Sequence, residues 1–211
     1  MADHPIFTES IRRIRALLGE TGLDPLQQQV LERLVHSSGD PGLAPLLQFS
    51  PDACEQGLDA LRQGALVLTD TAMAAAAVTP MARRTLGTSV RCLLDWAPVQ
   101  SPPGSTRSAA AMQRCWSELT AAAKLVGQPM PLVLVGSAPT ALEQLLDQVD
   151  GGAVMPSLVI GMPVGFVGVP ESKRRLASTA LAQIRLEGTR GGAGLVAAVA
   201  NALLRAAQAA N

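Results

Sequence analysis

The sequence predicts one α/β domain, arranged in three layers (α/β/α) around a mainly parallel sheet of about five strands. Two observations support this prediction. Beyond residue 60, short apolar runs alternate with longer segments of helical periodicity. The apolar runs are continuous rather than alternating, which is typical of strands buried on both faces. At 211 residues, the chain suits a single well-packed domain over residues 1–211.

Two helices are expected at the start of the chain, over roughly residues 8–38. The first, TESIRRIRALLG, has Thr8 as a cap, an apolar stripe of isoleucine and leucine, and a glycine stop. The second, PLQQQVLERLVHSSG, places Pro25 in its first turn and ends at Gly39. We expect both helices to pack as an addition to an α/β core over roughly residues 64–208.

The core is expected to alternate strands and helices. The expected strands, in chain order, are ALVLTD, VRCLLD, PLVLVG, SLVIG and AQIRLEG. The expected helices are STRSAAAMQRCWSELTAAAKLV, PTALEQLLDQV, PESKRRLASTA and GLVAAVANALLRAAQ. Ligands of such folds bind at the carboxyl ends of the strands. Those ends carry Thr69 with Asp70, Asp95, Gly136 with Ser137, and the stretch Gly161-Met162-Pro163.

The composition argues against several classes of protein. Seventeen basic residues balance seventeen acidic ones, and aromatic residues make up 2% of the chain, so a nucleic-acid-binding role is not expected. The most apolar window, SLVIGMPVGFVGVP, is too short to span a membrane and is interrupted by proline. The first residues lack the pattern of a signal peptide. We therefore expect a cytoplasmic protein without a membrane segment.

The three cysteines, Cys54, Cys92 and Cys115, are widely spaced and form no CxxC pair. An odd number without such a pair favours neither a disulfide framework nor a zinc site. We expect three buried thiols and no metal ligands.

Two stretches of the sequence have features of anion-binding sites. In GSAPTAL, Gly136 permits a tight turn, Ser137 can cap a helix and Pro139 fits its first turn, so free N–H groups would face a ligand. In STRSAAAM, Arg107 stands in the first turn of a long helix, where a positive charge opposes the dipole unless an anion lies beside it. A well-made loop without ligand and an idle, exposed arginine remain the alternatives.

The stretch GAGLVA, residues 192–197, matches the G-x-G-x-x-A pattern of dinucleotide-binding loops. Too few residues follow it for the second strand and its ribose-binding acid, so a nucleotide-binding regulator is rejected. The glycines can still let a backbone approach a bulky ligand closely.

His36 lies in the stretch LVHSSGD, residues 34–40, in the last turn of the second expected helix. The carbonyl end of a helix favours the imidazolium, which would raise the pKa of this histidine. From the residues alone, His36 is either a helix cap or a proton donor.

Six stretches together resemble the precorrin-8X methylmutase family. They are RLVHSSGDPGLA, LVLTDTAM, STRSAAAM, LVGSAPTALEQLL, LVIGMPVGFVGVPESK and EGTRGGAGLVAAVANAL, in the order and spacing of that family, from about residue 5 to residue 206. The resemblance implies an isomerase that moves a methyl group from C-11 to C-12 of precorrin-8X or cobalt-precorrin-8. The product is hydrogenobyrinic or cobyrinic acid, and the reaction needs no cofactor.

The resemblance also implies roles for residues. His36 takes the place of the proton donor, while Arg107 and Ser10 match residues that reach the substrate. Thr69 and Asp70 match a strand end that lines the cleft, and Ser137 stands where the family usually has asparagine. Ala76-Ala77 replaces the usual Ala-Gly.

The family further implies a homodimer with active sites near the subunit boundary, and a tetrapyrrole (corrinoid) substrate and product. The alternative function is a non-catalytic corrinoid carrier that binds the product and passes it to the next enzyme.

Overall fold

The computed structural model describes residues 4–209. Its strands are β1 (Leu47–Phe49), β2 (Val67–Thr69), β3 (Val90–Cys92), β4 (Leu132–Val135), β5 (Leu158–Gly161) and β6 (Gln183–Leu186). Its α-helices are α1 (Pro5–Leu18), α2 (Pro25–Ser38), α3 (Ala53–Arg62), α4 (Ala72–Arg84), α5 (Arg107–Val126), α6 (Pro139–Asp150), α7 (Val169–Ala177) and α8 (Ala193–Ala209). Two short 3₁₀ helices, η1 (Pro41–Leu46) and η2 (Leu93–Trp96), complete the described elements.

The strands form one sheet in the order β1-β6-β5-β4-β2-β3. The five strands expected from the sequence are all present and pair in parallel. The sixth strand, β1, pairs antiparallel with β6 at one edge. Its residues, LQF, follow the 3₁₀ helix η1 directly, so no turn signal separates this strand from the apolar residues before it. The predicted mainly parallel α/β fold is confirmed.

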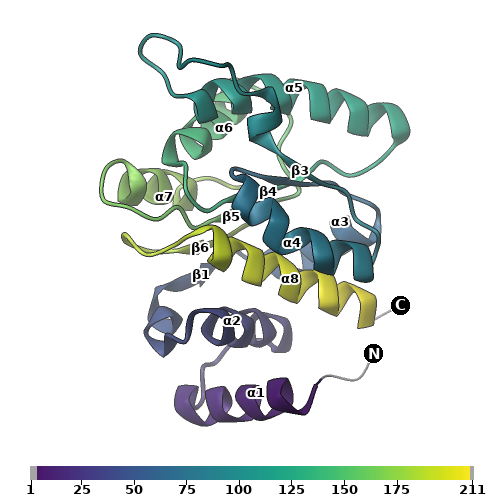
Figure 1. The fold of residues 1–211 in the computed structure, drawn as a ribbon, viewed down its shortest axis with the longest axis vertical. Coiled ribbons are helices and arrows are strands. Elements are labelled where there is room, and N and C mark those ends of the chain that lie inside the picture. Colours follow the sequence, from purple (N-terminus) through teal and green to yellow (C-terminus); the bar gives the residue numbers. More distant parts are fainter. Residues whose placement is uncertain (1–3, 210–211) are drawn as a thin grey trace.

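Helices cover both faces of the sheet, as Figure 1 shows. Side chains alternate along each strand, so Leu132 and Leu134 of β4 join the core under α3, α4 and α8, whereas Val133 and Val135 join the core under α5 and α6. Both cores consist mostly of Leu, Val and Ala. These strands are buried on both faces, and this burial accounts for their continuous apolar sequences.

The two N-terminal helices add outer layers on one side only (Figure 1). Helix α2 packs along α8, and α1 packs on α2. Residues between the two predicted segments form η1, β1 and α3. The expected cap of the first helix was wrong: α1 begins at Pro5, and His4 Nδ1 accepts the N–H of Ile6. Proline suits the first helical position, so the helix begins before Thr8.

The small-residue helix α4 has an exposed, uncharged stripe that includes Ala76 and Ala77. Both residues lie in the helix interior, where alanine is favoured over glycine. The departure from the usual Ala-Gly pair therefore suits the helix.

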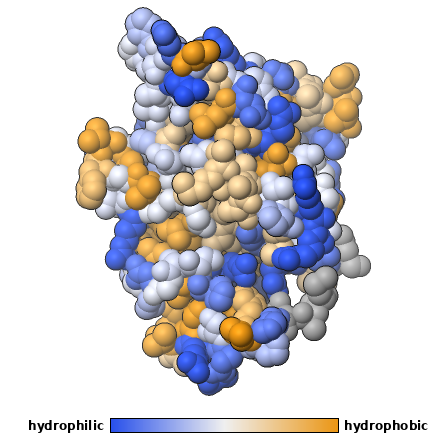
Figure 2. All heavy atoms as spheres, in the orientation of Figure 1, coloured by the Kyte–Doolittle hydropathy of each residue, from blue (hydrophilic) through white to orange (hydrophobic). Residues whose placement is uncertain are grey.

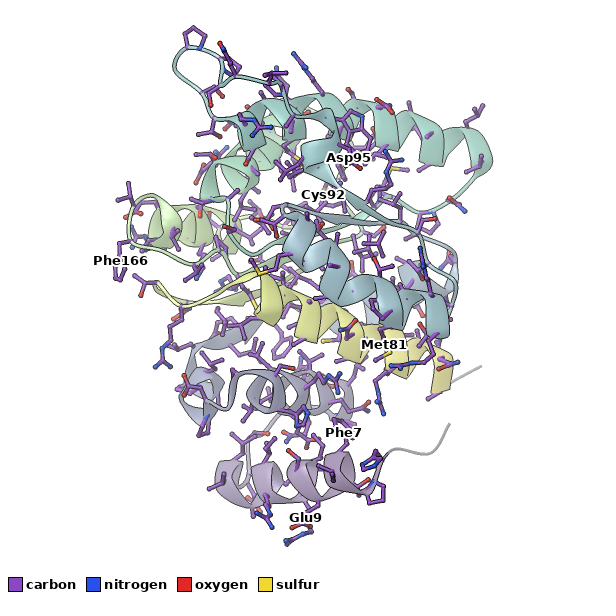
Figure 3. All side chains as sticks on the ribbon, viewed as in Figure 1. Phe7, Glu9, Met81, Cys92, Asp95 and Phe166 are labelled. Atoms are coloured by element: carbon purple, nitrogen blue, oxygen red, sulfur yellow. The ribbon has the colours of Figure 1, made fainter. Side chains whose placement is uncertain are left out.

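All three cysteines are buried free thiols, as expected. No helix within residues 4–209 combines the length and the apolar character needed to cross a membrane. Exposed apolar side chains cluster on the loop between β5 and α7 (Figure 2), which includes Val164, Phe166 and Val167. Phe166 lies at the outer edge of the molecule (Figure 3).

Candidate active site

Asp70 fixes the loop that follows β4 from inside the protein. The residue is 1% exposed, and its Oδ2 accepts the backbone N–H groups of Ser137 and Ala138 at 2.6 and 2.8 Å. Burial raises the pKa of this carboxyl, although the backbone hydrogen bonds oppose the shift. An internal carboxyl group thus occupies two of the N–H groups of GSAPTAL that were expected to face a substrate anion.

Thr69 is also fully buried, and its hydroxyl donates to the carbonyls of Thr71 and Arg91. Ser137 does not cap α6 with its side chain, contrary to the expectation; Ala138 is the N-cap residue, and Asp70 supplies the acceptor. Ser137 keeps an exposed side chain at the end of β4. Of these three residues, only Ser137 offers a side chain to a ligand.

Arg107 stands in the first turn of α5, where the sequence placed it. Thr106 caps that helix, and its hydroxyl lies 2.7 Å from the hydroxyl of Thr140 in the first turn of α6. This contact brings the starts of α5 and α6 together at the carboxyl edge of the sheet. Arg107 Nε donates to the Pro98 carbonyl at 2.8 Å, and the side chain is exposed. Because only Nε contacts Pro98, the terminal nitrogens of the guanidinium group can bind an anionic group.

His36 lies in the last turn of α2 and meets α1. Its Nδ1 is 2.8 Å from Ser10 Oγ. The Phe7 ring meets the imidazole edge-on, with ring centroids 5.0 Å apart at 80°, and Figure 3 shows Phe7 between the two helices. Because Nδ1 is engaged by Ser10, Nε2 is the ring atom available for proton exchange with a ligand.

The surroundings of His36 lower its pKa below the ordinary value of 6.5. Burial is the larger cause, and the positive charge of Arg33 on the same helix is the second. The expected upward shift of the His36 pKa was therefore wrong, because burial and the Arg33 charge both disfavour the imidazolium. The imidazolium is a stronger acid here than in water.

Sequence reasoning missed Phe7 and Arg33, which set this environment. Arg33 lies three residues before His36, so helical spacing could have revealed it as a neighbour. Phe7 comes from another helix, and no local pattern connects it to His36. Its ring also lies 5.2 Å from the Arg33 guanidinium and 5.0 Å from that of Arg205.

The structure divides the predicted site residues into two groups. His36 and Ser10 lie on the α1–α2 side of the sheet, whereas Arg107 lies on the α5–α6 side (Figure 1). Thr69, Asp70 and Ser137 lie at strand ends, between the two. Within residues 4–209, no three His, Cys, Asp or Glu side chains gather as a metal site would require.

Comparisons with known proteins agree on one family. The family model for precorrin-8X methylmutase matches residues 5–206. The precorrin-8X methylmutase of Pseudomonas aeruginosa is 38% identical over 203 residues, which cover 94% of this chain and 93% of that protein. The cobalt-precorrin-8 methylmutase of Synechocystis is 32% identical and covers 96% of this chain and 95% of that protein.

A solved structure gives the same answer. The precorrin-8X methyl mutase from Thermus thermophilus superposes with a TM-score of 0.80 at 36% identity, over 97% of this chain and 96% of that one. The chain belongs to the precorrin-8X methylmutase family.

Proposed function

We propose that this chain is a methylmutase that moves a methyl group from C-11 to C-12 of precorrin-8X or cobalt-precorrin-8 in cobalamin biosynthesis. Its relatives carry both names. The observation that carries the proposal is the pairing of His36 with Ser10 at 2.8 Å, in a chain of this family. The pairing leaves one ring nitrogen for the substrate.

His36 acts as the acid. In the imidazolium, Ser10 Oγ accepts the Nδ1 proton, so the Nε2 proton faces the macrocycle. Substrate and product are isomers: the bond from methyl to C-11 breaks, and the bond from methyl to C-12 forms. A proton given to the ring stabilises the charge that develops during the shift and must leave the ring again afterwards. No electron acceptor or donor is consumed.

The remaining residues bind or position the substrate. A corrinoid has a broad apolar disc with a rim of carboxylates, and Arg107 suits one of those carboxylates. The exposed Ser137 hydroxyl suits a second polar group at the rim. Thr69 and Asp70 hold the strand-end loops and do not touch the ligand, because both are buried.

A homodimer would account for the separation of His36 from Arg107. The helices that carry them, α2 and α5, lie on opposite sides of the sheet (Figure 1), so a second protomer can bring its Arg107 to the His36 of the first. We place the reaction in the cytoplasm, because three buried free thiols suit a reducing compartment.

The absorption spectrum tests the proposed reaction, since moving the methyl group changes the conjugated system. The protein is incubated with precorrin-8X and, in parallel, with cobalt-precorrin-8. Conversion of either one to the product spectrum is expected, and the faster conversion identifies the natural substrate. A saturable ligand shift without conversion of either compound would instead indicate a corrinoid carrier.

A further inference from the structure

Lys173, in the middle of α7, is a buried cation. It is 2% exposed, and its Nζ donates to the carbonyls of Gly188 and Arg190 at 2.9 and 2.6 Å. Burial lowers the pKa of this ammonium to about 8. An aliphatic side chain of the same length would avoid the cost of burying a charge. The two carbonyls belong to the loop between β6 and α8. The buried ammonium group therefore holds that loop in place.

The same loop, residues 187–192, is fastened to the end of β5. Gly192 N–H donates to the Met162 carbonyl at 2.9 Å. A Cβ on Gly191 would lie 2.0 Å from that carbonyl oxygen, so only glycine fits there. Gly191 lies just before the GAGLVA stretch; within that stretch, Gly192 contacts the β5 end through its N–H, and a Cβ on Gly194 would meet nothing within 4 Å. The backbone around Arg190 is thereby held on both sides.

Arg190 connects this loop to α2. Its Nη1 lies 2.9 Å from Asp40 Oδ2. Asp40 Oδ1 accepts the Gly42 N–H at 2.8 Å, and its own N–H donates to the hydroxyl of Ser38, the last residue of α2. His36 precedes Ser38 by two residues. A continuous set of contacts therefore runs from the buried ammonium of α7 to the helix end that carries the catalytic imidazole.

We propose that Lys173 and Arg190 are positioning residues, which hold the β6–α8 loop against Asp40 and so fix the His36 end of α2 for proton transfer. This inference rests on the proposed function of His36. It assigns a task to two residues that touch neither the imidazole nor, in this account, the reacting carbons.

Turnover is the first test. Arg190→Gln and Lys173→Met should each lower kcat by about tenfold or more while KM changes by less than about threefold, because a small displacement of a catalytic group slows chemistry steeply. Arg174→Gln is the matched control. It removes a cation from the helix that carries Lys173. Arg174 is exposed, and among residues 4–209 its ion pair is with Glu171 in the same helix, so kcat should stay at the wild-type value.

The titration of His36 by NMR is the second test and needs no substrate. The chain has two histidines, so His4 serves as an internal reference. Ser10 and Phe7 from α1, Arg33 from α2 and, beyond Phe7, Arg205 from α8 surround the ring. In both Arg190→Gln and Asp40→Asn, the C-terminal end of α2 should become looser and water should reach the imidazole more easily. The titration midpoint of His36 should therefore rise toward 6.5 in both variants.

The two variants separate positioning from a simple charge effect. Removing a positive charge raises the midpoint of a nearby histidine, whereas removing a negative charge lowers it. A rise in both variants supports positioning; shifts of opposite sign, or no shift together with an unchanged kcat, overturn it. Arg190 is exposed, so Arg190→Gln should fold normally. If Lys173→Met does not fold, the results for Arg190→Gln alone test the proposal. Wild-type protein without turnover would refute the proposed function but leave the NMR result interpretable.

Discussion

At His36, a hydroxyl, an aromatic edge and a guanidinium surround one imidazole ring. Ser10 engages Nδ1, Phe7 covers one edge, and Arg33 adds a positive charge nearby. The hydroxyl orients the ring, while burial and Arg33 make its proton easier to donate. The resemblance could identify His36 and Ser10. It could not give the direction of the pKa shift, because burial by Phe7 depends on how two helices pack.

Ser10→Ala removes the acceptor that orients His36. We expect unchanged product affinity and a kcat lowered by about 2- to 10-fold, the effect of a hydrogen bond worth about 0.5–1.5 kcal/mol. Ser10→Thr, which keeps the hydroxyl, is the matched control and should retain most of the activity. Single-turnover rates measure both. Equal rates for wild type and Ser10→Ala would show that the hydroxyl does not orient the ring.

Arg107→Ala removes a cation at the start of α5. Loss of a charge-assisted contact to a ring carboxylate should weaken corrinoid binding by about 1.5–3 kcal/mol. Arg107→Lys should recover part of the loss, because the charge is kept while the planar fork is lost. The dissociation constants for the product can be measured by absorption titration. An unchanged constant for the alanine variant would leave Arg107 with only its contact to Pro98.

At the scale of elements, the continuous apolar strands and the amphipathic helices could be predicted, because each needs only local periodicity. The strand β1 follows the 3₁₀ helix η1 without an intervening turn, so no local pattern marks where it begins. The loop after β4 could be recognised as a helix start, but the side chain that holds this loop could not. Asp70 lies 67 residues before Ser137 in the chain, and only the pairing of β2 with β4 brings the two together.

Asp70→Ala should loosen the start of α6. Two partly buried N–H groups lose their acceptor, so the free energy of unfolding should fall by about 1–3 kcal/mol. Asp95→Ala is the control: Asp95 follows β3 at the same edge but is exposed, with a 3.5 Å pair to Arg91, and should change stability by less than about 0.5 kcal/mol. Denaturant unfolding measures both. Equal stabilities for the two variants would show that Asp70 does not stabilise the loop before α6.

At the scale of the whole molecule, the sheet separates the helix that carries His36 from the helix that carries Arg107, and the proposed homodimer would bring these two residues together. Light scattering should give a mass near twice 21.8 kDa; a mass near 21.8 kDa at micromolar concentration would contradict the dimer.

Mixing the His36→Ala and Arg107→Ala proteins, after dissociation and reassembly, should restore about a quarter of the active sites. Random pairing makes about half of the dimers mixed, and each mixed dimer has one site in which both His36 and Arg107 are intact. No recovery would place both residues of each site in one chain.

The central claim is that His36 donates a proton during methyl transfer. The most direct measurement is kcat/KM against pH for wild type and His36→Ala, with product binding as the check on folding. The value of kcat/KM reports ionisations of the free enzyme. Only the imidazolium can donate, so the wild-type value should fall as pH rises through the pKa of His36, at a midpoint below 6.5.

For His36→Ala, kcat should drop by roughly 10²–10⁴-fold, the usual contribution of a positioned acid. The fall of kcat/KM near the His36 midpoint should disappear, while product affinity stays near that of wild type. A folded His36→Ala protein that binds product and converts substrate at a near wild-type rate, with the pH profile unchanged, would contradict the claim.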